Sequence, residues 1–243
     1  MLSYDVADEA AWITLDRPEK RNALTVPDWR ELVEQLERAE AEARVAVLTG
    51  TGEAFCAGDD VAALDAVETE ADVGKLAACL SDAFFGIETL DVPVVAAVNG
   101  HAYGGGCELV AAADLAVTVE GARFALPETS IGAYPPYAME RAAETVGRKR
   151  LMELALTGEP IDADRAREWG LVNRVVSDGE LKSAVEGLVA SIAESPPTAT
   201  RTAKRAAAAG LASAEERERI HDSFGTVLDD DECRAATRAF LED

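Results

Sequence analysis

Lysine and histidine are scarce in this sequence. Its 243 residues include two histidines, and only five of its 23 basic residues are lysines, against 46 acidic residues and a net charge of −23. Because a nucleic-acid partner requires a basic face that neutralises phosphates, this composition excludes nucleic acid as a partner. So few histidines also leave little from which to build a metal site, and we predict none.

Cysteine is also sparse and shows no pattern. Its four copies are scattered and form no Cys-x-x-Cys pair. This spacing indicates reduced thiols in a cytoplasmic protein rather than a disulfide framework or a zinc site. No apolar run reaches the roughly 18 residues of a membrane-spanning helix, and the polar, acidic start is not typical of a signal peptide. The sequence therefore predicts a cytoplasmic protein without a membrane partner.

The acidic residues are spread along the whole chain rather than collected in one segment. A disordered acidic tail would be one interpretation of such a charge, but this distribution favours a folded protein with an acidic surface. At about 1 M salt the Debye length is only ~3 Å, so the mutual repulsion of these charges is screened. We therefore interpret the composition as that of a halophilic protein, soluble in concentrated salt.

Short apolar strands, each followed by a glycine turn and a helical stretch, recur along the chain. The strands and their turns lie at residues 45–60, 92–106 and 113–128, and residues 26–42 have apolar side chains at helical spacing. The stretch AAWITLDRP, residues 10–18, alternates and ends at a proline, which predicts an edge strand. This alternation of strands and helices favours the α/β class over an all-α fold.

The last part of the chain differs from the rest. Residues 196–243 begin with two prolines and are helical in composition. Their apolar positions have little core of their own to enter; these are Phe224, Val227, Leu228 and Phe240. We therefore predict a core domain over residues 1–195 and a helical region over residues 196–243 that packs on another subunit.

Three consecutive glycines stand between an apolar strand and an apolar helix, in VNGHAYGGGCELV, residues 98–110. Such a triplet can simply allow positive φ or tight helix packing. It can also let a ligand atom approach the unpaired N–H groups of a helix N-terminus, which stabilise an oxyanion. The spacing matches neither the dinucleotide-binding G-x-G-x-x-G nor a P-loop, so neither of those sites is predicted.

Two acidic residues lie close to glycine turns. Glu108 lies two residues after the triplet within an apolar run, and Glu128 follows Pro127 in FALPETSIG. Each alone could be an ordinary acid in the first turn of a helix. Together, near an oxyanion site and without metal ligands, they suit general acid–base chemistry on a carbon activated by a carbonyl. A second glycine turn, AFCAGDD at residues 54–60, would add another N–H donor to that carbonyl oxygen.

Five blocks of the chain carry a resemblance to a known family. They are LDRPEKRNALT (15–25), GEAFCAGDDV (52–61), VPVVAAVNGHAYGGGCELVAAADLAV (92–117), RFALPETSIGAYP (123–135) and VGRKRLMELALTGEPIDADRAREWGLVNRVV (146–176). In this order and spacing they resemble the enoyl-CoA hydratase/isomerase, or crotonase, superfamily over nearly the whole chain. The resemblance implies an α/β fold, a spiral of ββα repeats with a C-terminal helical trimerisation region. It also implies a homotrimer or dimer of trimers.

The resemblance implies roles for individual residues. It places the oxyanion donors at the backbone N–H groups of Asp59 and Gly105 and the two carboxylates at Glu108 and Glu128. The implied reaction adds one water across the 2,3 double bond of an enoyl-CoA thioester. Coenzyme A is then part of the acyl-CoA substrate, and no separate cofactor is needed. Further contacts to this substrate are implied for Arg21, which lies near phosphate, and for Ala23, Ala57, Gly58, Asp60, Val61, Gly104, Tyr134 and Pro135.

One segment departs from the family pattern. Hydratases of this family carry Gly-Gly-x-x-Arg-Leu after the second acid, whereas YPPYAMERAAETVG has Pro136 and Tyr137 in place of the glycines. Because this segment lines the acyl end of the site, three hypotheses remain open. The first is a 2-enoyl-CoA hydratase of fatty acid β-oxidation, which the retention of both acids favours. The second is another crotonase reaction, such as 3,2-enoyl-CoA isomerisation by a single acid or a hydrolysis, and the third is a non-catalytic acyl-CoA-binding oligomer.

Overall fold

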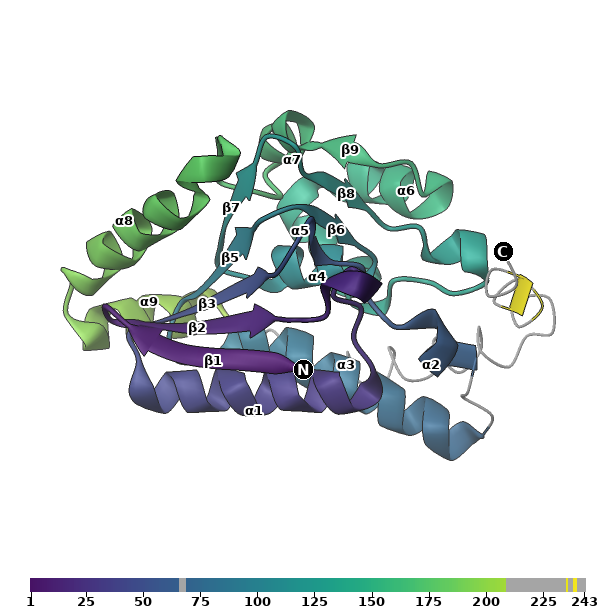
Figure 1. The fold of residues 1–243 in the computed structure, drawn as a ribbon, viewed down its shortest axis with the longest axis horizontal. Helices are drawn as coiled ribbons and strands as arrows, with labels where there is room; N and C mark the ends of the chain where they lie inside the picture. Colours follow the sequence, from purple (N-terminus) through teal and green to yellow (C-terminus); the bar gives the residue numbers. More distant parts are fainter. Residues whose placement is uncertain (66–68, 209–234, 236–237, 240–243) are drawn as a thin grey trace.

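The chain folds into strands and helices that alternate along the sequence (Figure 1), in a computed structural model that describes residues 1–65, 69–208, 235 and 238–239. The strands are β1 (Leu2–Ala7), β2 (Ala10–Leu15), β3 (Val45–Gly50), β4 (Ala54–Cys56), β5 (Val94–Val98), β6 (His101–Tyr103), β7 (Leu115–Val119), β8 (Arg123–Ala125), β9 (Ile161–Asp162) and β10 (Arg174–Val176). The helices are α1 (Val26–Glu42), α2 (Val61–Asp65), α3 (Glu70–Thr89), α4 (Gly105–Ala112), α5 (Ala143–Val146), α6 (Arg148–Thr157), α7 (Ala163–Trp169), α8 (Leu181–Ala193) and α9 (Pro197–Ala207). Shorter helical turns are η1 (Pro18–Lys20), η2 (Glu128–Ile131), η3 (Ala138–Ala142) and η4 (Asp178–Glu180).

The strands form two sheets, and from β3 to β8 consecutive strands alternate between them. The larger sheet has the order β1-β2-β3-β5-β7-β10, and the smaller has the order β4-β6-β8-β9. The pairs β3–β4, β5–β6 and β7–β8 each contribute one strand to each sheet, and β2, β3, β5, β7 and β10 run parallel. Each pair is followed by helical structure. The α/β class and the spiral of ββα repeats are therefore confirmed.

The prediction of an edge strand at residues 10–18 was wrong. Strand β2 lies inside the sheet, parallel to β3, and β1 pairs with it antiparallel from Leu2↔Leu15 to Ala7↔Ala10. The true edge, β1, is mostly exposed, so its sequence does not resemble a buried strand. The hairpin turn is made by Asp8 and Glu9, which both have positive φ, without the glycine that usually marks such a turn.

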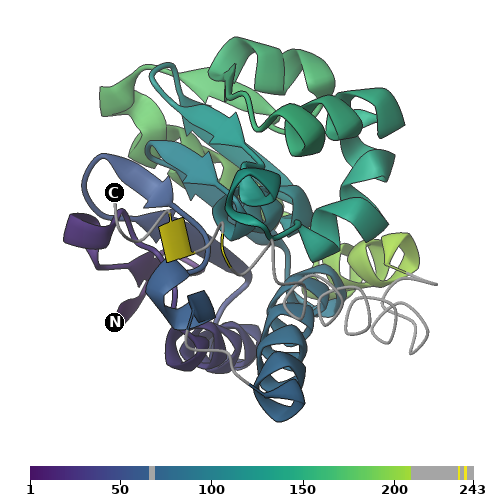
Figure 2. The same cartoon turned by 90° about the vertical axis from the view of Figure 1, so that its right-hand side faces the viewer.

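The helices enclose the larger sheet and surround a buried central helix. Helix α1 covers the predicted span 26–42 and packs along α3 beneath β1–β3, while α8 lies against β3, β5 and β7. Helix α4 contacts both β4 and β6, and Figure 2 shows it among the strands near the middle of the molecule. Nearly all its residues are buried, in keeping with its apolar sequence. No helix within the described ranges is long and apolar enough to cross a membrane.

Helix α9 inserts one buried lysine into the core of its own chain, and its Arg201 and Arg205 contact Glu40 and Asp91 nearby. The Lys204 ammonium donates to the carbonyl oxygens of Ile87 at 2.8 Å and Val92 at 2.9 Å, and it pairs with Asp114 at 2.6 Å. Burial lowers the pKa of Lys204 and raises that of Asp114, and their pairing opposes both shifts. The start of the predicted C-terminal region is thus attached to the core, whereas Phe224, Val227, Leu228 and Phe240 lie outside the described residues.

Two truncations test the predicted role of residues 196–243 in assembly. A chain ending at Ser195 should be monomeric or aggregated in light scattering, and it should melt at a lower temperature because Asp114 loses its buried partner. A chain ending at Ala208 keeps Lys204, so it should lose assembly with a smaller loss of melting temperature. A well-behaved trimer that ends at Ser195 would refute the prediction.

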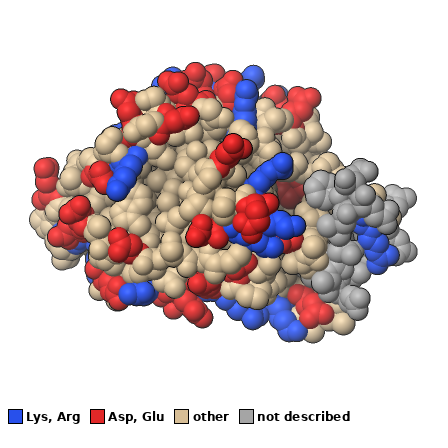
Figure 3. Space-filling model, in the orientation of Figure 1, with Lys and Arg blue, Asp and Glu red and all other residues tan. Residues whose placement is uncertain are grey.

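Acidic side chains are distributed over the visible face of the molecule, with basic side chains between them (Figure 3). We expect the melting temperature to rise between about 0.1 M and 2 M KCl, because the Debye length falls from ~10 Å at 0.1 M to ~3 Å at 1 M and self-repulsion weakens. The same screening should help a polyanionic CoA ester approach the acidic surface, so its KM should fall. Calorimetry and steady-state kinetics over this range check both expectations. A melting temperature that stays flat or falls with salt would contradict the halophilic interpretation.

Candidate active site

The glycine triplet is explained by two backbone segments that pass very close to one another. A Cβ atom at Gly106 would lie 2.2 Å from the carbonyl oxygen of Cys56 at the end of β4. A Cβ atom at Gly58, where φ is 86°, would lie 2.7 Å from the backbone nitrogen of Gly105. Real Cβ atoms do not approach backbone atoms this closely. The turn after β4 and the N-terminus of α4 can therefore touch only because these positions lack side chains.

Two backbone N–H groups lie where these segments meet and are available as hydrogen-bond donors. Gly105 is the first residue of α4, so its N–H has no acceptor within the helix. The bonds from Leu24 N–H to Gly58 O and from Asp60 N–H to Leu24 O bracket Asp59. Among the described residues, no other residue accepts a hydrogen bond from the N–H of Asp59 or from the N–H of Gly105. The N–H of Asp59 interacts with the carboxyl group of the same residue. Such donors can stabilise an oxyanion.

Glu108 projects from the first turn of α4 and is 2% exposed. Its Oε1 atom accepts a hydrogen bond from the N–H of Ala138 at 2.7 Å, at the start of η3. Burial, followed by repulsion from Glu128, raises the pKa of Glu108 well above its usual range. The predicted helix-start position is confirmed, but here the carboxyl group is enclosed by protein rather than exposed at a helix end.

Glu128 opens η2 and reaches the same place from the other side. Its Oε1 atom would lie 3.3 Å from a Cβ at Gly104, so this carboxyl group lies over the start of α4. Its Oε2 atom is buried and has no hydrogen-bond partner among the residues that the structure describes. Burial raises the pKa of Glu128 to about 8, with a further contribution from the charge of Asp59. A carboxyl group with such a pKa can hold a proton near neutral pH.

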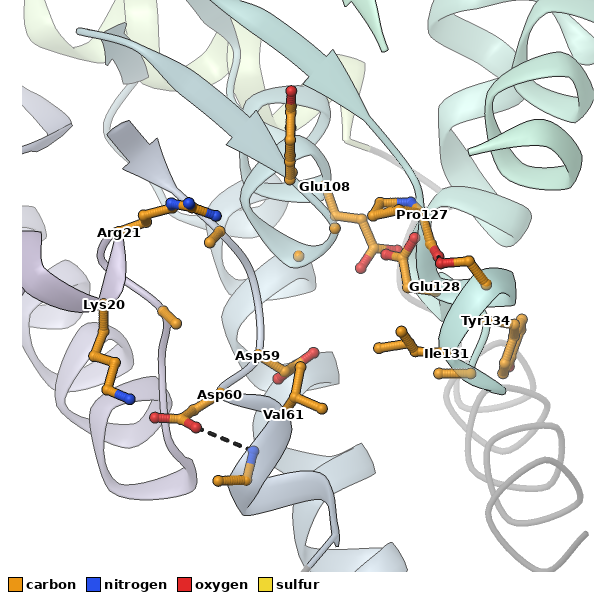
Figure 4. A pocket seen from close by; sticks show the side chains of 18 of the residues that line it. Lys20, Arg21, Asp59, Asp60, Val61, Glu108, Pro127, Glu128, Ile131 and Tyr134 are labelled. Carbon is orange, nitrogen blue, oxygen red and sulfur yellow. Dashed lines mark hydrogen bonds between the residues drawn. The ribbon is translucent and has the colours of Figure 1, made fainter. Parts of the chain in front are cut away.

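One cavity of about 520 Å³ joins these groups (Figure 4). Most of the predicted site residues line it: Arg21, Ala23, Ala57, Asp59, Asp60, Val61, Gly104, Gly105, Glu108, Glu128 and Tyr134. Gly58 lies behind the lining against Gly105, and Pro136 rather than Pro135 faces the cavity. Residues that were not predicted also line it: Glu19, Lys20, Ala62, Tyr103, Pro127, Ser130, Ile131 and Ala133. Most of these residues are sequence neighbours of predicted site residues, and this was the only signal in the sequence that they line the cavity.

The mouth of the cavity is shaped by the loop that carries Lys20 and Arg21. Asn22 is fully buried, and its amide donates to the carbonyl oxygens of Thr51 and Ala54 at 2.9 and 2.8 Å. Arg21 and Asn22 both have positive φ, which this anchoring maintains. Figure 4 shows Lys20 and Arg21 on the same side of the cavity. Two cationic side chains therefore stand at the entrance of an otherwise acidic and apolar cavity.

The segment that departs from the family pattern, residues 134–147, places one of its aromatic side chains in the core. The ring of Tyr137 packs against Phe84 with ring centroids 4.9 Å apart, and its hydroxyl donates to Glu88 at 2.8 Å. Arg141 also donates to Glu88, at 3.2 Å. Tyr134 and Pro136 line the cavity instead. The segment thus supplies Glu108 with an N–H partner while it narrows this end of the cavity with apolar groups.

Several known proteins are similar to this chain. The short-chain-enoyl-CoA hydratase of Clostridium acetobutylicum is 31% identical over 241 residues, which cover 96% of this chain and 92% of that protein. The carnitinyl-CoA dehydratase of Salmonella enteritidis is 40% identical over 200 residues, 79% of this chain and 74% of that protein. The crystal structure of an enoyl-CoA hydratase/isomerase from Mycobacterium paratuberculosis matches with a TM-score of 0.90 at 28% identity, over 98% of this chain and 97% of that one. The sequence model described as enoyl-CoA hydratase/isomerase matches residues 6–243. The chain therefore belongs to the enoyl-CoA hydratase/isomerase family, within the crotonase superfamily.

Proposed function

We propose that this protein is an enoyl-CoA hydratase that adds water across the 2,3 double bond of an enoyl-CoA thioester. The observation that carries the proposal is the presence of two glutamates, the buried Glu108 and the half-buried Glu128, in one cavity beside two available backbone N–H groups. The enoyl-CoA hydratase and carnitinyl-CoA dehydratase names of the relatives support the same class of reaction.

In the proposed mechanism, the thioester oxygen accepts hydrogen bonds from the N–H groups of Asp59 and Gly105. Glu108 and Glu128 hold one water between them. As a glutamate carboxylate takes a proton from this water, the oxygen forms a bond to Cβ and the π electrons move toward the thioester oxygen. The two N–H donors stabilise the resulting enolate. Cα then takes a proton from the acid pair, with Glu128 as the donor, and the pair regains its original proton count.

The protonation state of the glutamate pair suits a mechanism with one proton acceptor and one proton donor. Hydration needs one carboxylate that accepts a proton and one carboxylic acid that donates one. Burial raises the pKa of both glutamates, and repulsion from Glu128 adds to the rise for Glu108, which favours a pair that retains a proton near neutral pH. A single buried acid would not provide both roles at once.

We propose that coenzyme A enters at the mouth of the cavity as part of the substrate. Arg21 is placed to bind its phosphates, since a guanidinium matches phosphate oxygens in a bidentate manner. Ala23, Ala57, Asp60 and Val61 would lie along the adenine and pantetheine, and Tyr134 would lie near the acyl group. We also propose a cytoplasmic homotrimer or dimer of trimers that acts in fatty acid metabolism.

Two alternatives make different predictions in one assay. A 3,2-enoyl-CoA isomerase needs only one acid, and an acyl-CoA-binding oligomer needs none. In about 2 M KCl, hydration should remove the absorbance of the conjugated enoyl thioester when short, medium and branched 2-enoyl-CoAs are supplied. Isomerisation should instead generate that absorbance from a 3-enoyl-CoA. Tight binding of every ester without any change in absorbance would support the non-catalytic alternative.

A further inference from the structure

The proposed hydration uses the backbone N–H of Asp59 but leaves its side chain without a role. That carboxyl group lines the same cavity as Glu108 and Glu128 (Figure 4). Its Oδ1 atom accepts a hydrogen bond of 2.8 Å from the indole Nε1 of Trp29. Asp59 therefore adds a third carboxyl group to the glutamate pair, in a cavity that Glu19 and Asp60 also line.

Trp29 holds the Asp59 carboxyl group in place. The indole is fully buried on α1, and its ring lies edge-on to Phe84 with centroids 5.3 Å apart. A Cβ at Gly105 would lie 3.1 Å from the same ring, so Trp29 lies beneath both backbone turns of the site. Because the indole cannot rotate in this packing, its N–H fixes the orientation of the Asp59 side chain.

The charge of Asp59 is not neutralised by a cation. In the described part of the chain no lysine or arginine forms an ion pair with Asp59, Glu108 or Glu128. The adjacent Asp60 instead pairs with Arg17 at 2.8 Å. The other titratable and charged groups around Asp59 are the buried Cys56 thiol, the Tyr103 phenol in the cavity wall, and Glu19, Lys20 and Arg21 at the mouth.

We propose that the Asp59 carboxylate keeps a proton on the glutamate pair, so that an acid remains available to protonate Cα near neutral pH. This inference rests on the proposed hydratase function. The repulsion between carboxylates in one buried cavity favours successive rather than simultaneous ionisation. Burial raises the pKa of Asp59 to about 6, and the Trp29 N–H limits that rise, so Asp59 ionises before Glu128. Its negative charge then opposes ionisation of both glutamates.

The substitution Asp59→Asn tests this proposal because it removes the charge while it preserves the shape and an acceptor for Trp29. We expect the pH profile of kcat to shift to lower pH by about half a unit or more, since the loss of a nearby negative charge lowers the pKa of both glutamates. KM should change little. The matched control is Glu53→Gln, which removes the same charge from the exposed turn before β4, where water screens it. Its profile should coincide with that of the unmodified protein.

A direct titration of the carboxyl groups tests this proposal independently of whether the protein is a hydratase. ¹³C NMR of labelled carboxyl groups should show the Glu108 and Glu128 midpoints at lower pH in Asp59→Asn, whether or not the protein hydrates any ester. Trp29→Phe removes the indole N–H and should raise the Asp59 midpoint. Glutamate midpoints that do not move in Asp59→Asn would overturn the proposal. Equal shifts in Asp59→Asn and Glu53→Gln would also overturn it, because they would indicate a general effect of net charge.

Discussion

Glutamine at position 128 should lower kcat by about 100-fold or more, because a glutamine amide cannot supply the proton that Cα receives. The same substitution at position 108 should have a similar effect, since hydration needs both an acceptor and a donor of protons. Binding of the CoA ester should survive in both variants, because neither side chain lies at the mouth where Lys20 and Arg21 stand. Single-turnover kinetics and calorimetric titration with a product CoA ester measure the two quantities separately.

The comparison between the two variants carries the mechanistic information. If both acids participate, Glu108→Gln and Glu128→Gln are both nearly inactive. If Glu108→Gln keeps near-full activity while Glu128→Gln is inactive, a reaction that uses one acid is the better account. Unchanged melting temperatures would show that the losses of activity arise in the chemical step. We expect both variants to stay folded, because a buried neutral amide replaces a buried carboxyl group of similar size.

Alanine at position 106 should damage both the fold and the site. The added Cβ would lie 2.2 Å from the carbonyl oxygen of Cys56 and 2.7 Å from its carbonyl carbon, and neither atom belongs to a side chain that could rotate away. Helix α4 must therefore move away from β4, at a cost of about 1–3 kcal/mol or more in the free energy of unfolding. This movement would carry the Gly105 N–H and Glu108 out of position, so kcat should fall steeply.

The matched control for this prediction is Gly187→Ala, the same substitution in the exposed part of helix α8. A Cβ there meets no atom within 4 Å. Alanine should stabilise this helix by up to ~1 kcal/mol, since glycine is the poorer helix former. Denaturant unfolding and kcat of both variants test the contrast. A Gly106→Ala protein with unchanged stability and activity would show that β4 and α4 do not meet as closely as described.

Local patterns in the sequence predicted much of the fold. The spacing of Trp29, Leu32 and Leu36 predicts α1 because one face of an isolated helix must be apolar to be buried. The repeated apolar runs predicted β3, β5 and β7 for a similar reason, since each of these central strands is a short apolar segment. The acids Glu108 and Glu128 were predicted to share a site from their position beside glycine turns, and the cavity contains both.

Contacts between distant segments could not be predicted in this way. Strand β1 is paired through its backbone, so its exposed side chains give no signal of burial. Asp59 was expected to contribute only a backbone N–H, because nothing in the sequence indicates that Trp29, 30 positions earlier, reaches its carboxyl group. Lys204 suggests an exposed charge on a helix, yet its partners are carbonyl oxygens 117 and 112 residues away. Each of these features depends on tertiary packing alone.

The product formed in D₂O tests the central claim most directly. If Glu108 and Glu128 add water to a 2-enoyl-CoA, NMR of the product should show a 3-hydroxyacyl-CoA with a single deuterium at Cα. The oxygen at Cβ reports the water addition, and the deuterium reports the proton delivered by the acid pair. An unsaturated product that carries deuterium without a hydroxyl group, or an unchanged ester that remains bound, would contradict the account.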